Sequence, residues 1–188
     1  MILELKKISF SEALSDDSSA FAAEVFIDGV KRATAQNSGH GGPTSVDAYA
    51  KLRQSPEGDK AYSTERKANR AVLDQYEAWA KTQPEIETDL PTEGGGTFSY
   101  ARSLEHDVDN LLEEWLKAKD AQRAEARIKR MCSKNWVFSL TEKDGKPCDP
   151  NTVYTIPRQS HQTLAVLKKH LTEKYGAALK DFLNERYS

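Results

Sequence analysis

The sequence predicts an α+β fold in which a small antiparallel sheet, made of an N-terminal three-stranded unit and a C-terminal hairpin, packs with long amphipathic helices. Two patterns predict this class. Apolar and polar residues alternate near the N-terminus, as in half-buried strands, and apolar residues recur at helical spacing from about Tyr100 to Cys132. With 188 residues, the chain is long enough for one buried core or two small ones. We expect its three tryptophans, Trp79, Trp115 and Trp136, to be largely buried.

The N-terminal segments predict three antiparallel strands. Leu3 and Leu5 begin an alternating pattern that indicates the first strand. The strongest hairpin signal follows, with Asp28-Gly29 as a two-residue turn and residues 30–36 as the returning strand. The strand before this turn places four apolar residues on one face: Phe21, Ala23, Val25 and Ile27. A helix must cover the apolar face of such a sheet.

Three helices are predicted in the middle of the chain. Thr44 is a candidate N-cap with Asp47 three residues later, which predicts a short helix from Val46 to Arg53. A second helix is expected from Asp59 to Thr82, with an apolar stripe of Ala68, Val72, Tyr76 and Trp79 or Ala80. Three cations lie close together in its first half: Arg66, Lys67 and Arg70. The longest helix runs from about Tyr100 to Cys132, with the stripe Leu104, Val108, Leu111, Leu112, Trp115 and Ala118.

The rest of the chain predicts a second hairpin and a helical end. Residues 136–140 and 153–156 are the expected strands of that hairpin. Ser160 is the expected cap of a last helix that stops at Gly176, and a short helical tail is expected from 177 to 185. We expect one domain over 1–188, or a division into 1–82 and 98–188 around a linker-like loop, 83–97, that contains Pro84, Pro91 and three consecutive glycines.

Charge and cysteine usage exclude several classes of protein. Lys and Arg number 27 against 29 acidic residues, a formal charge of −2, which removes any global attraction to nucleic acid and any strongly acidic surface. Only Cys132 and Cys148 are present, so neither a disulfide framework nor a zinc site is indicated, and no metal or cofactor is expected. The absence of a signal peptide or a long apolar run predicts a cytoplasmic protein without a membrane partner.

A glycine-rich loop is the first candidate ligand site. It runs from Ser38 through Gly39, His40, Gly41 and Gly42 to Thr44 and Ser45, between a predicted strand and a predicted helix. Free backbone N–H groups and the positive end of a helix dipole would favour an anion there, and Lys31 and Arg32 precede the loop. A tight turn alone also explains the glycines, because the loop matches neither the P-loop nor the dinucleotide motif.

Two basic segments are further candidates. Arg158 and His161, at the expected start of the last helix, could clamp a phosphate or carboxylate, although Ser160 as a simple cap also explains this segment. The second half of the longest helix carries Arg123, Arg127, Lys129, Arg130 and Lys134 after an acidic first half. That order matches the helix dipole, and no aromatic residues are interleaved, so a solvated helix is preferred over a nucleic-acid surface.

Catalytic patterns are weak. The four histidines form no H-x-x-x-H pair, and Glu113 and Glu114 are adjacent, so they do not face one site. Cys132 lies near the end of a helix, where the negative end of the dipole raises a thiol pKa and disfavours a nucleophile. We predict no catalytic residue.

The segments Phe21–Gly29 and Asn37–Gly42, followed by charged helices, resemble those of small uncharacterised proteins of bacteria and their phages. The resemblance implies no activity, but small proteins of mobile elements often inhibit a host factor or sequester a nucleotide signal. We therefore predict a non-enzymatic binding protein for a small anionic or nucleotide-like ligand. The alternatives are a protein interaction module or inhibitor of a host protein that acts through a helix face, and, third, an enzyme with an unrecognised site. Apolar stripes on charged helices would also permit self-association.

Overall fold

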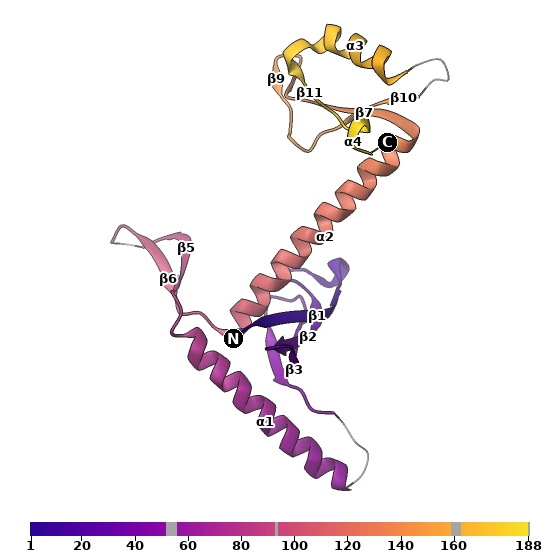
Figure 1. The fold of residues 1–188 in the computed structure, drawn as a ribbon. Coiled ribbons are helices and arrows are strands. Elements are labelled where there is room, and N and C mark those ends of the chain that lie inside the picture. Colours follow the sequence, from indigo (N-terminus) through magenta and orange to yellow (C-terminus); the bar gives the residue numbers. More distant parts are fainter. Residues whose placement is uncertain (52–55, 93, 159–162, 188) are drawn as a thin grey trace. The chain divides into compact units, whose positions relative to one another are not determined.

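The fold is α+β, and the computed structural model describes residues 1–51, 56–92, 94–158 and 163–187 (Figure 1). The chain divides into two compact units, Met1–Leu116 and Lys117–Ser188, and the boundary lies within the longest helix. Each unit has its own apolar core. In the described part of the chain, no helix combines the length and apolar character needed to cross a membrane.

The first unit is built on a four-stranded antiparallel sheet in the order β1-β2-β3-β4. Asp28 and Gly29 connect β2 to β3 with φ angles of 51° and 78°, the conformation that a two-residue hairpin turn requires. The predicted hairpin and its pairing with the first strand are confirmed, with Leu5 opposite Val25. The strands are β1 (Leu3–Phe10), β2 (Phe21–Ile27), β3 (Val30–Asn37) and β4 (Ser45–Ala48), and a 3-10 turn, η1, covers Glu12–Leu14.

The fourth strand corrects the expected helix from Val46 to Arg53. Residues 45–48 form β4, in which Val46 lies opposite Ala35 of β3. The free edge of β3 offers backbone N–H and C=O groups with which residues 45–48 pair as a strand. This pairing overrides the helix-capping pattern of Thr44 and Asp47. Residues 52 and 53 lie outside the described part of the chain.

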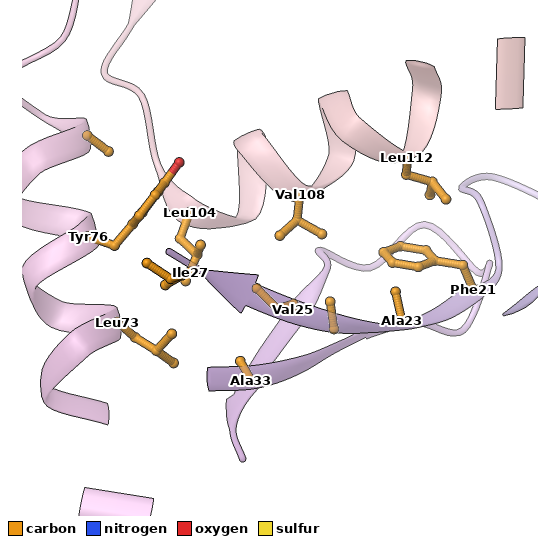
Figure 2. Packing of buried hydrophobic residues seen from close by; sticks show 12 residues of the cluster. Phe21, Ala23, Val25, Ile27, Ala33, Leu73, Tyr76, Leu104, Val108 and Leu112 are labelled. Atoms are coloured by element: carbon orange, nitrogen blue, oxygen red, sulfur yellow. The ribbon is translucent and has the colours of Figure 1, made fainter. Parts of the chain in front are cut away.

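Two helices cover the apolar face of this sheet: α1 (Pro56–Ala80) and α2 (Leu104–Lys134). Figure 2 shows Leu73 of α1 and Val108 of α2 directed at the strands, whereas the Tyr76 hydroxyl points toward the start of α2. Most of the stripe expected on α1 is confirmed, since Tyr76 and Ala80 are buried and Val72 packs against the core, but Ala68 is exposed. The side chains of α1 that are buried include Asn69, Leu73, Tyr76 and Ala80. Trp79 and Trp115 are half-buried at the margin of this core, whereas Trp136 is buried in the second unit.

The segment expected as a linker-like loop, 83–97, contains most of a hairpin. Strand β5 (Ile86–Pro91) pairs with β6 (Thr97–Tyr100), and Ile86 lies opposite Tyr100. The glycines at 94–96 lie in the connection between these strands and therefore mark a turn. The hairpin lies between α1 and α2 in the chain (Figure 1).

The second unit has a three-stranded sheet in the order β10-β7-β11. Its strands are β7 (Asn135–Leu140), β10 (Tyr154–Pro157) and β11 (Leu179–Phe182), and a small hairpin pairs β8 (Glu142–Lys143) with β9 (Lys146–Pro147). The predicted pairing of β7 with β10 is confirmed, with Phe138 opposite Tyr154. The expected helical tail from 177 to 185 is wrong, because residues 179–182 pair with β7 instead. Only α4 (Asn184–Tyr187) and a 3-10 turn, η2 (Gly176–Ala178), are helical there.

Helix α3 (Leu164–Tyr175) packs on this second sheet through Leu167 and Leu171. Thr163 is its N-cap, since its side chain accepts a hydrogen bond from the Val166 N–H, and Gly176 ends the helix. Ser160, the expected cap, lies outside the described residues. The helices therefore range from the 31 residues of α2 to the four of α4, so not all are long.

Candidate functional site

The glycine loop between β3 and β4 is a tightly hydrogen-bonded turn. The Gly39 carbonyl accepts hydrogen bonds from the backbone N–H groups of residues 16–18 at 2.9, 3.1 and 3.3 Å. Gly39 has a φ of 90°, and a Cβ there would lie 2.0 Å from the carbonyl oxygen of Leu14. Both the conformation and the space therefore require glycine at this position.

The loop uses its own backbone donors internally. The Gly39 N–H donates to Asn37 Oδ1 at 2.9 Å, and the Gly41 N–H donates to Ser18 Oγ at 3.2 Å. Asn37 Nδ2 in turn donates to the Gly42 carbonyl at 2.9 Å. The loop also leads into β4 and not into a helix, so it lacks the dipole that was expected to attract an anion. This arrangement favours the turn interpretation of the glycines.

The polar side chains of the loop face different partners. Thr44 is buried, and its hydroxyl donates to Asp109 Oδ1 of α2 at 2.5 Å. It therefore connects the residue before β4 to α2 and is not the N-cap of a helix. The Ser45 hydroxyl donates to Asp47 Oδ2 at 3.1 Å. Ser38 and His40 are exposed. No common ligand position follows from these four side chains.

A hollow of about 240 Å³ adjoins the loop and is lined by loop residues and by α2. Ser18, Asn37 and Thr44 contribute polar groups, and Asp109 and Glu113 contribute carboxylates. Among the described residues, no lysine or arginine lines it. The negative lining opposes binding of a phosphate or carboxylate beside the glycines.

Lys31 and Arg32 have partners of their own on the sheet. Lys31 Nζ lies 2.8 Å from Glu24 Oε1 and 3.9 Å from the centre of the Tyr49 ring, and Arg32 Nη1 donates to Asn69 Oδ1 at 3.0 Å. The hydrogen bonds from Lys31 and then from Lys7 lower the pKa of Glu24. Six residues of extended β3, about 20 Å, separate Lys31 from the end of the strand, where the loop starts.

The other predicted donors belong to the second unit. Arg158 Nη2 donates to the Cys132 carbonyl at 2.7 Å, and its guanidinium carbon lies 4.4 Å from the centre of the Trp136 ring. It thus binds a carbonyl near the end of α2, where a cation is favourable. His161 lies outside the residues that the structure describes. Arg158 is therefore engaged within its own unit.

A groove lined by three cations, which we call the cationic groove, was not predicted from the sequence. It is an open groove of about 410 Å³ between β4 and the first half of α1. Asp47 and Ala48 line it from the strand, and five residues line it from the helix: Tyr62, Ser63, Arg66, Lys67 and Arg70. Tyr62, Arg66 and Arg70 follow one another at four-residue spacing, which places them on one helix face.

The charge of the cationic groove is largely uncompensated. Arg70 Nε pairs with Asp74 Oδ1 at 3.1 Å on the exposed side of α1. Arg66 and Lys67 are exposed, and within the described ranges neither forms an ion pair. Asp47 is the single acid of the lining. The sequence does show the three neighbouring cations of the groove. It does not show the strand that faces them, because residues 46–53 were expected to form a helix.

Among the described residues, the cysteine and histidine side chains lie apart from one another and from carboxylates. Cys132 is buried, and this burial raises the pKa of its thiol. His106 contacts the Tyr100 hydroxyl through Nε2, with the two ring centres 4.4 Å apart. Within the described ranges, no histidine side chain pairs with a carboxylate, and no group of three His, Cys, Asp or Glu residues could hold a metal ion.

Comparison with known proteins adds no relative: no family model, no curated protein and no solved structure matches the chain.

Proposed function

We propose that this protein is a non-enzymatic binding protein that takes up a small anionic, nucleotide-like ligand in the cationic groove. One observation carries the proposal: three cations and a tyrosine line a single groove of about 410 Å³. The ligand class is the one that the sequence analysis favoured, but its position is on β4 and α1, not at the glycines.

The lining of the cationic groove matches the two chemical halves of a nucleotide. The guanidinium groups of Arg66 and Arg70 can bind phosphate oxygens in pairs, and Lys67 adds a further charge. Tyr62 offers a ring face on which a base can stack. The carboxylate of Asp47 and the hydroxyl of Ser63 can accept hydrogen bonds from a base amine or a sugar hydroxyl.

The surrounding charge makes the cationic groove distinctive. The first unit carries 12 Lys and Arg against 21 Asp and Glu, a formal charge of −9. The groove therefore gathers three of the unit's 12 cations against one acid on an otherwise acidic surface. An anion that approaches the unit is favoured at this place over the rest of its surface.

The test is a thermal-shift screen of the full chain with nucleoside phosphates, cyclic nucleotides and sugar phosphates, followed by calorimetry on any compound that stabilises it. Arg66→Ala with Lys67→Ala should weaken binding at least about tenfold, because two charge-assisted contacts are lost. Lys60→Ala with Lys81→Ala removes the same charge from exposed positions outside the groove and should leave affinity unchanged. Equal loss in both double variants, or no stabilisation by any compound, would contradict the proposal.

Tyr62 separates a nucleotide site from a simple phosphate site. Tyr62→Leu should weaken binding of a nucleotide but not of inorganic phosphate, and Tyr62→Phe should keep both, since the ring face remains. If Tyr62→Leu changes neither affinity, the ligand is an anion without an aromatic group.

A second candidate function, a protein interaction module, is favoured by the β5–β6 hairpin. Leu90 and Phe98 are 65% and 51% exposed, so two large apolar side chains of one short hairpin face solvent. A partner that covered both side chains would remove this apolar surface from water, which favours association. A photo-crosslinking amino acid at position 98 should capture one defined partner, or a second copy of the chain, whereas one at exposed Thr64 should not. Cross-linking that is equally diffuse at both positions would exclude the hairpin.

A further inference from the structure

The overall formal charge of −2 conceals two units of opposite sign. The first unit carries −9, whereas the second carries 15 Lys and Arg against 8 Asp and Glu, a formal charge of +7. Such asymmetry between the parts of a chain is typical of proteins with a polyanionic partner. The boundary at Leu116 also divides α2, so its basic half belongs to the second unit.

The basic half of α2 presents its cations in order. Arg123, Arg127, Arg130 and Lys134 follow at spacings of four, three and four residues, which places them on one helix face. We call this set the basic stripe. All four are exposed, and it extends over about 16 Å at 1.5 Å per residue.

Few acids neutralise the basic stripe. Arg123 Nη1 lies 3.5 Å from Asp120 Oδ1, and both side chains are more than half exposed, so this pair contributes little. Arg127, Arg130 and Lys134 form no ion pair with any residue that the structure describes. From residue 120 to 127 the helix is exposed on every side, so a partner can approach its whole circumference.

We propose that the basic stripe binds the phosphate backbone of double-stranded nucleic acid, independently of sequence. The major groove, about 12 Å wide, admits one α-helix. Residues 120–127 are exposed around the whole helix, and the last turns of α2, which pack through Ile128, Met131 and Cys132, still leave Arg130 and Lys134 exposed, so the stripe can contact phosphates along the rim of the groove. This surface belongs to the second unit and does not depend on the cationic groove of the first.

Two other polyanions fit the basic stripe less well. A single strand is bound by stacking on aromatic side chains, and residues 117–134 contain none. A membrane surface requires large apolar residues on the opposite face of the helix, but alanines and Glu125 dominate that part of the sequence. A duplex needs neither stacking residues nor an apolar face.

The test is fluorescence anisotropy of the full chain with a labelled DNA duplex of arbitrary sequence at 50 to 200 mM salt. Four phosphate contacts should give a slope of log affinity against log salt of roughly −3 to −4. Glutamine at all four positions of the basic stripe should weaken binding at least tenfold and flatten this slope. A charge-matched control replaces Lys143, Lys146, Lys169 and Lys180, which are exposed elsewhere in the second unit, and should keep the affinity within threefold.

Three results would overturn the proposal. Equal loss in both quadruple variants would assign binding to diffuse charge. Tighter binding to a single strand of the same length, or to phosphatidylserine vesicles, would assign the surface to another partner. No binding to the duplex at 50 mM salt would exclude it. Arg66→Ala with Lys67→Ala should not affect the duplex measurement, so failure of this proposal and failure of the groove proposal can be told apart.

Discussion

Tyr76 of α1 donates a hydrogen bond of 2.6 Å from its phenol to Asp107 Oδ2 of α2, and both residues are almost fully buried, at 1% and 3% exposure. Arg102 Nε donates to the other carboxylate oxygen at 2.5 Å. The carboxylate is therefore compensated by one neutral and one charged donor. This contact joins the two helices that cover the sheet of the first unit.

The Tyr76–Asp107 contact predicts a loss of stability at alkaline pH. Burial, and then the hydrogen bond to Asp107, raises the pKa of Tyr76 above the ordinary value of about 10. The unfolded phenol ionises first, so the stabilisation is complete below about pH 10 and is lost as the pH rises further. Tyr76→Phe should cost about 1 to 3 kcal/mol at pH 7 and should flatten this decline. Urea unfolding from pH 7 to 11 measures both, with Tyr62→Phe as control; parallel curves for Tyr76→Phe and the wild type would contradict the assignment.

Alanine substitutions at Gly39 and Gly42 of the glycine loop should differ in their effect on stability. Gly39→Ala forces a non-glycine residue to a φ of 90° and brings Cβ within 2.0 Å of the Leu14 carbonyl oxygen. It should cost about 3 kcal/mol or more, since a left-handed residue alone costs about 1 to 3 kcal/mol. Gly42→Ala meets nothing within 4 Å and needs no unusual φ, so it should be nearly neutral. Thermal unfolding compares them, and equal losses would mean that the loop does not have this conformation.

Local signals explain which strands the sequence could predict. The Asp28-Gly29 turn and the alternating residues of β2 act over a few positions, so they determine the hairpin without reference to the rest of the chain. The same holds for the apolar run of β7.

Strands β4 and β11 could not be predicted in the same way. Each is four residues long and lies at the edge of its sheet. Val46 pairs with Ala35, and Leu179 pairs with Leu140, nearly 40 residues earlier. Their local patterns favour helix, and only the backbone hydrogen bonds of a partner strand reverse that preference.

The cationic groove depends on the same tertiary pairing. Arg66, Lys67 and Arg70 were recognised on a predicted helix, but their partner surface, Asp47 and Ala48, exists only because β4 is a strand beside α1. The composition of the glycine loop predicts an anion site, whereas at Gly39 the structure shows a steric requirement for glycine. A groove formed by two elements, β4 and α1, is not visible in the sequence of either element alone.

The first core predicts a difference between two adjacent leucines of α2. Leu112 is 3% exposed and packs in the core of the first unit (Figure 2). Leu111 is only half-buried. Leu112→Ala should cost about 2 to 5 kcal/mol. Leu111→Ala should cost about 1 kcal/mol, because the substitution removes less buried apolar surface. Chemical denaturation of both variants tests the orientation of the helix, and a larger loss at Leu111 would mean that α2 is rotated.

The second unit contains a buried asparagine that holds three segments together. Asn184 has 0% exposure; its Oδ1 accepts from the Val137 N–H at 2.6 Å, and its Nδ2 donates to the carbonyls of Cys132 and Asn135 at 3.1 and 2.9 Å. The side-chain amide of this α4 residue therefore forms hydrogen bonds with backbone groups at the end of α2 and at the start of β7.

Asn184→Asp keeps the shape of this side chain but removes both donors, and it should cost about 3 to 5 kcal/mol at pH 7, because a buried carboxylate then faces two carbonyl oxygens. Burial must raise the pKa of the introduced carboxyl in the folded state, so the variant should recover stability as the pH falls, when the proton restores a donor. Asn151→Asp, in an exposed turn, is the matched control and should change stability by less than about 0.5 kcal/mol. Hydrogen exchange of the Val137 amide reports how readily this region opens, because an aspartate at 184 can still accept from the Val137 N–H and only the two donor contacts are lost. Exchange at Val137 as slow in Asn184→Asp as in the wild type, with equal stability at pH 7, would show that this amide does not connect the segments.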